Sequence, residues 1–63
     1  MLNAEQRSLL KLFDLSSREK AIADMLAKLP FIKYSEMSSQ VQTIVRKLMR
    51  MSDFEFGLLK KRL

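Results

Sequence analysis

The chain has 63 residues, which suits one small domain and leaves too little length for a second hydrophobic core. Its 12 Lys and Arg residues outnumber its 7 Asp and Glu residues, giving a net charge of +5 that no His can change near neutral pH. The absence of Cys and His excludes disulfides, the usual catalytic nucleophile and base, and the soft metal ligands. We therefore expect a protein that is not an enzyme and that uses no cofactor, metal or small-molecule substrate.

The hydropathy of the chain predicts whether it folds and in which compartment it lies. Apolar residues make up 48% of the chain, too large a share for intrinsic disorder, so the chain can collapse around a core. No apolar stretch is long enough for a signal peptide or for a membrane span. We expect a soluble, cytoplasmic protein without a membrane span.

Capping signals predict where the first two helices begin. Asn3 followed by Gln6 resembles a capping box, in which the cap side chain accepts a backbone N–H and the third helical residue reaches back. Ser16 with Glu19 repeats this pattern. Pro30 ends the second helix, because the residue before a proline is disfavoured in the helical conformation. The expected helices span residues 4–13 and 17–29.

The link over residues 30–34 is rich in apolar side chains, so we expect it to lie across the core. After it, Ser35 or Ser38 can cap a third helix. In this third segment the apolar residues recur at helical spacing and form one stripe, with polar residues on the opposite side. The third helix is expected over residues 36–50, with Met37, Val41, Ile44, Val45 and Leu48 on the stripe.

A further capping box, Ser52 with Glu55, predicts a short C-terminal helix over residues 53–62. Met51, just before the cap, can pack on Phe56 as a hydrophobic staple. The glutamates near the helix starts are explained by capping and do not require acid–base chemistry. Together these signals predict an all-α fold, a small bundle of three main helices plus a short C-terminal fourth helix, in a single domain over residues 1–63.

Six basic residues form the first candidate functional surface. Three of them fall on the polar side of the third helix and three lie at the end of the chain. Nucleic acid, an acidic protein surface or anionic lipid would relieve their mutual repulsion. A solvated helix face explains the same pattern, and no aromatic residue interleaves with these charges to stack on single strands. The candidate anion-binding or nucleic-acid-binding residues are Arg46, Lys47, Arg50, Lys60, Lys61 and Arg62.

The apolar surplus of the C-terminal helix is the second candidate. Phe56 and Leu59 fall on one side of this helix, whereas Phe54 and Leu58 fall on another. Methionines adapt to irregular partner surfaces, although they also fill gaps in a core. The candidate protein-interaction residues are Phe54, Leu58 and Met49.

Four elements of the chain match a known pattern. The most specific is Met, Ser or Thr, Asp, any residue, Glu and Phe, which residues 51–56 satisfy. The others are Glu5-Gln6 with Leu9 and Leu10, Ser17-Arg18-Glu19 followed by Ile22 and Met25, and Val45-Arg46-Lys47-Leu48. In these elements the chain resembles the transposon-transfer assisting proteins of Firmicutes, a family of small proteins associated with conjugative transposons.

The resemblance implies a single-domain bacterial protein with an accessory role in the transfer of a mobile element, and it favours Phe56 as the aromatic residue that faces the core. Its partner would be a protein of the transfer apparatus or a second copy of the chain, contacted through helical surfaces. The chain departs from the pattern at Phe54, where the family residue is usually small, and at its basic end, where members end in acidic residues. No charge-based function carries over, and a small basic DNA-binding protein or regulator, or an inhibitor of a host enzyme, are the alternatives.

Overall fold

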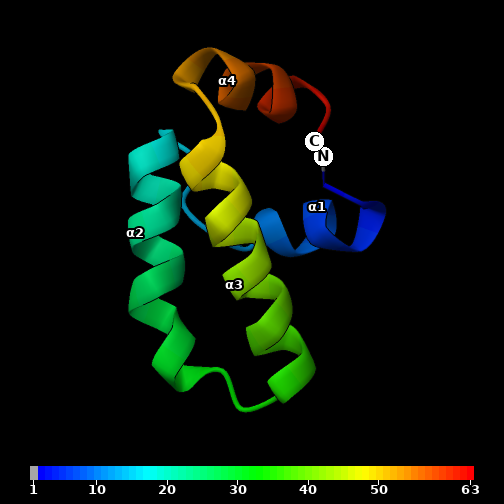
Figure 1. The fold of residues 1–63 in the computed structure, drawn as a ribbon, viewed down its shortest axis with the longest axis vertical. Helices are drawn as coiled ribbons and strands as arrows, with labels where there is room; N and C mark the ends of the chain where they lie inside the picture. The colour runs from blue at the N-terminus through cyan, green and yellow to red at the C-terminus, as the bar shows by residue number, and fades with distance from the viewer. Residues whose placement is uncertain (1) are drawn as a thin grey trace.

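The computed structural model describes residues 2–63, in which helices are joined by short links and no strand occurs (Figure 1). The all-α class predicted from the sequence is confirmed. The elements are α1 (Ala4–Leu10), α2 (Arg18–Lys28), the 3₁₀ turn η1 (Leu29–Phe31), α3 (Ser35–Arg50) and α4 (Asp53–Lys61).

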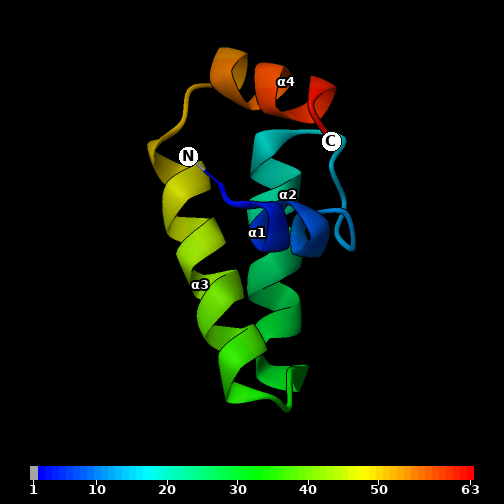
Figure 2. The same ribbon diagram turned by 90° about the vertical axis from the view of Figure 1, so that its right-hand side faces the viewer.

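Helices α2 and α3 form an antiparallel pair, and the two short helices are placed around it (Figure 1). Helix α1 packs across the pair and contacts α3 (Figure 2). Helix α4 lies across the end of the pair at which α2 begins and α3 ends, and the two ends of the chain lie on the same side of the molecule (Figure 1).

The core forms around α3. Its buried residues recur at the spacing of one helical face, as the apolar stripe predicted, and they meet apolar side chains from every other α-helix. Burial of this stripe removes four apolar side chains of α3 from water, which stabilises the fold. The buried hydrophobic residues are Leu2, Leu10, Ala21, Met25, Val41, Ile44, Val45, Leu48, Phe56 and Leu59.

Two predicted capping boxes are present. In α1 the backbone N–H of Gln6 donates to Asn3 Oδ1 at 2.8 Å, and the N–H of Asn3 donates to Gln6 Oε1 at 3.2 Å. In α4 the N–H of Glu55 donates to Ser52 Oγ at 3.1 Å, and the N–H of Ser52 donates to Glu55 Oε1 at 2.9 Å. Each box satisfies backbone donors that a helix start leaves without intrahelical partners.

The first helix is shorter than predicted, because α1 ends at Leu10 and not at residue 13. After Leu10 the chain forms a turn with a bond between residues three apart, in which the N–H of Phe13 donates to the Leu10 carbonyl at 3.2 Å. The next N–H, that of Asp14, donates at 2.9 Å to the Asp24 carboxylate of α2. The Asp14 N–H therefore bonds to α2 and not to the Leu10 carbonyl, as a helix through residue 13 would require.

The caps of α2 and α3 also differ from those expected. Ser17 caps α2, accepting from the N–H of Lys20 at 3.1 Å, whereas the hydroxyl of Ser16 donates to Asp14 Oδ1 at 2.6 Å. Helix α3 begins at Ser35 after Tyr34, which makes no side-chain capping bond, so neither predicted serine caps it.

The link between α2 and α3 was expected to lie across the core, and this prediction is wrong for its aromatic residues. Pro30 sits near the start of η1, where it needs no backbone N–H, so the chain continues as a tight turn past Lys28, the last residue of α2. Ile32 packs partly against the core, whereas Phe31 and Tyr34 are largely exposed.

Arg18, the first residue of α2, joins three helices. Its Nη1 donates to the carbonyl of Leu48 near the end of α3 at 3.0 Å, and its Nε pairs with Asp53 Oδ1 at the start of α4 at 2.9 Å. The Leu48 carbonyl also accepts the backbone N–H of Met51 at 3.2 Å, so Arg18 supplies its second donor. The Arg18 side chain is 21% exposed and that of Asp53 is 84% exposed, so the backbone bond is the better shielded of the two.

We predict that Arg18→Ala lowers the free energy of unfolding by about 1–2 kcal/mol, because it removes a charge-assisted bond to the backbone together with an ion pair. Asp53→Asn should cost less than about 1 kcal/mol, because the ion pair alone is exposed to water. Urea unfolding of both variants measures the difference. Equal losses would show that the ion pair, not the bond to the Leu48 carbonyl, holds the junction.

Candidate functional site

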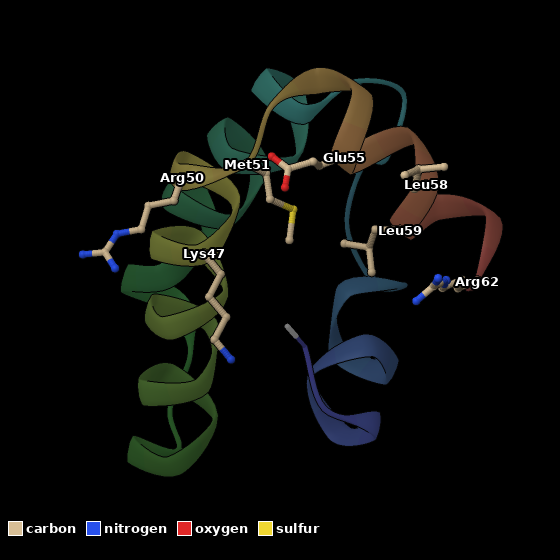
Figure 3. Close-up of a pocket in the computed structure, with 7 residues that line it drawn as sticks. All are labelled: Lys47, Arg50, Met51, Glu55, Leu58, Leu59 and Arg62. Atoms are coloured by element: carbon tan, nitrogen blue, oxygen red, sulfur yellow. The ribbon is translucent and has the colours of Figure 1, made fainter.

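A hollow of about 520 Å³ lies between the C-terminal end of α3 and helix α4 (Figure 3). Its apolar part is made by Met51, Leu58 and Leu59. In Figure 3, the side chains of Met51 and Leu59 point into the space beneath α4. Leu59 is buried and Leu58 is 45% exposed, so the apolar lining runs from the core out to the surface.

Three cationic side chains lie around this apolar lining. Lys47 and Arg50 come from α3, and Arg62 follows the end of α4. Figure 3 shows Lys47 and Arg62 reaching toward the hollow from opposite sides, whereas the guanidinium of Arg50 points outward at the edge. The hollow is therefore apolar inside and positively charged around its edge.

Lys47 is held in place by a buried amide. Its Nζ donates at 3.0 Å to Oε1 of Gln6, whose own Nε2 donates at 3.0 Å to Gln40 Oε1. Gln6 is only 4% exposed, and a buried amide requires such partners. The sequence marked Gln6 as a capping residue, and its second role in joining α1 to α3 was missed. The available signal was its place on the otherwise apolar face of the first helix.

Glu55 is the one acidic residue that lines the hollow. The backbone N–H of Ser52, followed by the Ser52 side chain, holds the pKa of the Glu55 carboxyl below its ordinary value of 4.5. The carboxylate is thus ionised near neutral pH and is already engaged at the helix start. With one carboxylate and three cationic side chains around it, the hollow keeps a net positive charge.

The structure separates the six basic residues predicted as one anion-binding surface. Lys47, Arg50 and Arg62 line the hollow, but Lys60 lies on the other side of α4, where its Nζ is 5.9 Å from the centre of the Phe56 ring. Arg46, whose Nε donates to the Gln42 carbonyl at 3.5 Å, and Lys61 are exposed and do not line the hollow.

Two of the three predicted protein-interaction residues are neighbours. Phe54 and Leu58 are four residues apart on α4, which places them on one face, and Phe54 is 75% exposed. Met49 is exposed as well, but it lies two residues from Lys47 on α3, about 200° around the helix axis. Met49 therefore does not belong to the surface around the hollow.

Other kinds of site find no support in the part of the chain that the structure describes. Residues 2–63 contain no cluster of acidic side chains able to hold a metal ion. No buried side-chain nitrogen or oxygen in that range lacks a hydrogen-bond partner. None of the described helices has the length and hydropathy that a membrane crossing requires.

Comparison with known proteins identifies the family. A family model described as putative transposon-transfer assisting protein matches residues 2–60, nearly the whole chain. The chain belongs to this family. The name of the family points to a role in assisting the transfer of transposons. Searches of curated proteins and of solved structures gave no match.

Family membership confirms the resemblance drawn from the sequence, and the structure shows what two of the matching elements do. Arg18, from the element at the start of α2, binds Asp53, from the element at the start of α4. Ser52 and Glu55 of the same element form the capping box, and Phe56 is buried in the core. These residues position α4 and so create the hollow, whose edge is formed by other residues.

We predict that Glu55→Gln makes stability less dependent on pH in acid. The folded-state pKa of Glu55 is lowered, so its contribution to stability is complete above the unfolded value and is lost as pH falls through the folded value. Gln can keep the capping box but cannot titrate. Urea midpoints measured at a series of pH values below 4.5 should fall less steeply for the variant than for the parent. Parallel curves would contradict the assignment.

Proposed function

We propose that this protein is a non-enzymatic accessory factor of a bacterial conjugative transposon or related mobile element, acting in the cytoplasm through contacts of its helices with another protein of the transfer apparatus. The family supports the context of transposon transfer. The mode of action is inferred from the surface of the chain.

The observation that carries this proposal is the exposed apolar face of α4. Phe54 and Leu58 lie side by side in water although Phe56 and Leu59, on the same short helix, are buried. Exposed apolar side chains next to a hollow are typical of protein-binding surfaces, and aromatic residues often supply most of the binding energy there. Self-association through the same face is the other form of this proposal, and sedimentation at several concentrations separates the two.

We predict that a donor strain lacking this protein transfers its element less often, and that the Phe54→Ala, Leu58→Ala double variant fails to restore transfer. Truncating a buried aromatic contact at an interface weakens binding by ~30-fold. Phe54 is 75% exposed in the free protein, so Phe54→Ala by itself should lower the free energy of unfolding by less than about 0.5 kcal/mol. The measurement is the mating frequency, with unfolding curves alongside.

The control for this test is Lys61→Ala, an exposed residue of α4 that does not line the hollow. It should restore transfer as the parent does. Normal transfer by the double variant, or normal transfer in the absence of the protein, would contradict the proposal. A collapse of the folded state in the double variant would show that Phe54 and Leu58 belong to the core.

Direct binding of duplex DNA is the alternative function, and the net charge of +5 with adjacent, exposed Arg46 and Arg50 favours it. Contacts with phosphate weaken steeply as salt rises, whereas apolar contacts persist. The division of the basic residues between the two sides of α4 leaves no continuous basic strip at the C-terminal end.

We therefore predict no retarded complex with duplex DNA at physiological salt in an electrophoretic mobility assay. Any complex seen at low salt should disappear as salt is added. A complex that survives physiological salt, and that is lost when Arg46, Lys47 and Arg50 are replaced by Gln, would favour the DNA-binding function over protein contact.

A further inference from the structure

The hollow between α3 and α4 combines an apolar interior with a positively charged edge. Its interior is apolar, with Met51 and Leu59 pointing into it and Leu58 at its outer edge. Its edge is cationic on both sides. A volume of about 520 Å³ accommodates a few side chains and is too small for a folded domain. The occupant must therefore offer apolar side chains and negative charge together.

The two arginines at the edge, Arg50 and Arg62, are available to bind an anion. The ion pairs found within residues 2–63 are Arg18 with Asp53 and Lys28 with Asp24. Arg50 and Arg62 thus have no carboxylate partner in the described part of the chain. Guanidinium groups at the edge of an apolar surface bind carboxylates well, because their planar donors match two carboxylate oxygens.

The fold indicates the conformation of the occupant. No strand edge exists in the described residues, so an extended segment could not pair its backbone there. A helix satisfies its own backbone hydrogen bonds, so it can enter an apolar hollow that offers its backbone no partner. Duplex DNA fits less well, since phosphates gain nothing from the apolar interior made by Met51 and Leu59.

We propose that this hollow binds an acidic amphipathic helix of a partner protein, with apolar side chains of that helix inside and its carboxylates on Arg50 and Arg62. This inference rests on the proposed function and specifies the chemistry of the partner. Lys47, fixed by Gln6, adds positive potential on the α3 side. Leu58 belongs both to the hollow and to the exposed face of α4, so the two surfaces are continuous.

The experiment uses the full chain and a fluorescein-labelled peptide of helix-favouring sequence, with Leu at helical spacing on one face and Glu along its flanks. A second peptide carries Gln in place of every Glu, and a third carries Lys. Fluorescence anisotropy should show that the Glu peptide binds ~10-fold or more tightly than the Gln peptide at moderate salt. Methyl chemical shifts should change at Met51, Leu58 and Leu59.

Charge reversal tests the residues at the edge. The double variant Arg50→Glu, Arg62→Glu should lose ~10-fold or more in affinity for the Glu peptide and should bind the Lys peptide instead. Binding of the Lys peptide also shows that the variant is folded. Arg46→Glu is the matched control, because it makes the same charge change on α3 outside the hollow and should alter binding little.

A second pair of variants tests the apolar contact between the peptide and the hollow. Leu58→Ser should weaken binding of the Glu peptide severalfold, whereas Leu12→Ser, an exposed leucine outside the hollow, should not. The inference is overturned if the Glu and Gln peptides bind alike or not at all. It is also overturned if Arg46→Glu is as harmful as the double reversal, or if a short DNA duplex displaces the peptide at moderate salt.

Mating tests of the two double variants distinguish a failure of this inference from a failure of the proposed function. Loss of transfer in the Phe54→Ala, Leu58→Ala chain with normal transfer in the Arg50→Glu, Arg62→Glu chain would leave protein contact standing and remove the hollow as its site. Normal transfer in both would remove the proposed function, whatever the peptide does.

Discussion

The apolar stripe of α3 is the feature on which the rest of this structure depends. Val41, Ile44, Val45 and Leu48 are all buried, and they form one core cluster with buried side chains from α1, α2 and α4. A domain of this size has little apolar surface to bury, and this chain has no disulfide to add stability. Every α-helix therefore contributes buried side chains to this one core, and only the outer faces of the helices remain for binding.

Two long-range polar contacts then fix the angles at which the helices meet. Arg18 connects the start of α2 with the junction between α3 and α4, and Gln6 connects α1 with α3. Apolar packing alone is compatible with several orientations of a short helix, whereas hydrogen bonds between partly buried groups have definite geometry. The shape of the hollow follows from both contacts, because one places α4 and the other places Lys47.

Local signals in the sequence were sufficient where local interactions decide the structure. The boxes at Asn3 and Ser52 join residues three apart, and the stripe of α3 repeats within one helix, so both were predictable. The end of α1 was not, because it depends on Asp24, ten residues beyond Asp14. The sequence also could not predict which basic residues line the hollow, because that depends on how α4 crosses the bundle.

Helix α4 has fewer buried residues than α3, which buries four. Only Phe56 and Leu59 of this helix are buried, and Gly57 between them gives the helix backbone additional freedom. Elements with few buried contacts open at a lower free energy than the whole fold, so backbone amides of α4 should exchange with solvent before those of α3. Because α4 forms one wall of the hollow, a ligand seated there would also slow that exchange, linking occupancy to the closing of the helix onto the bundle.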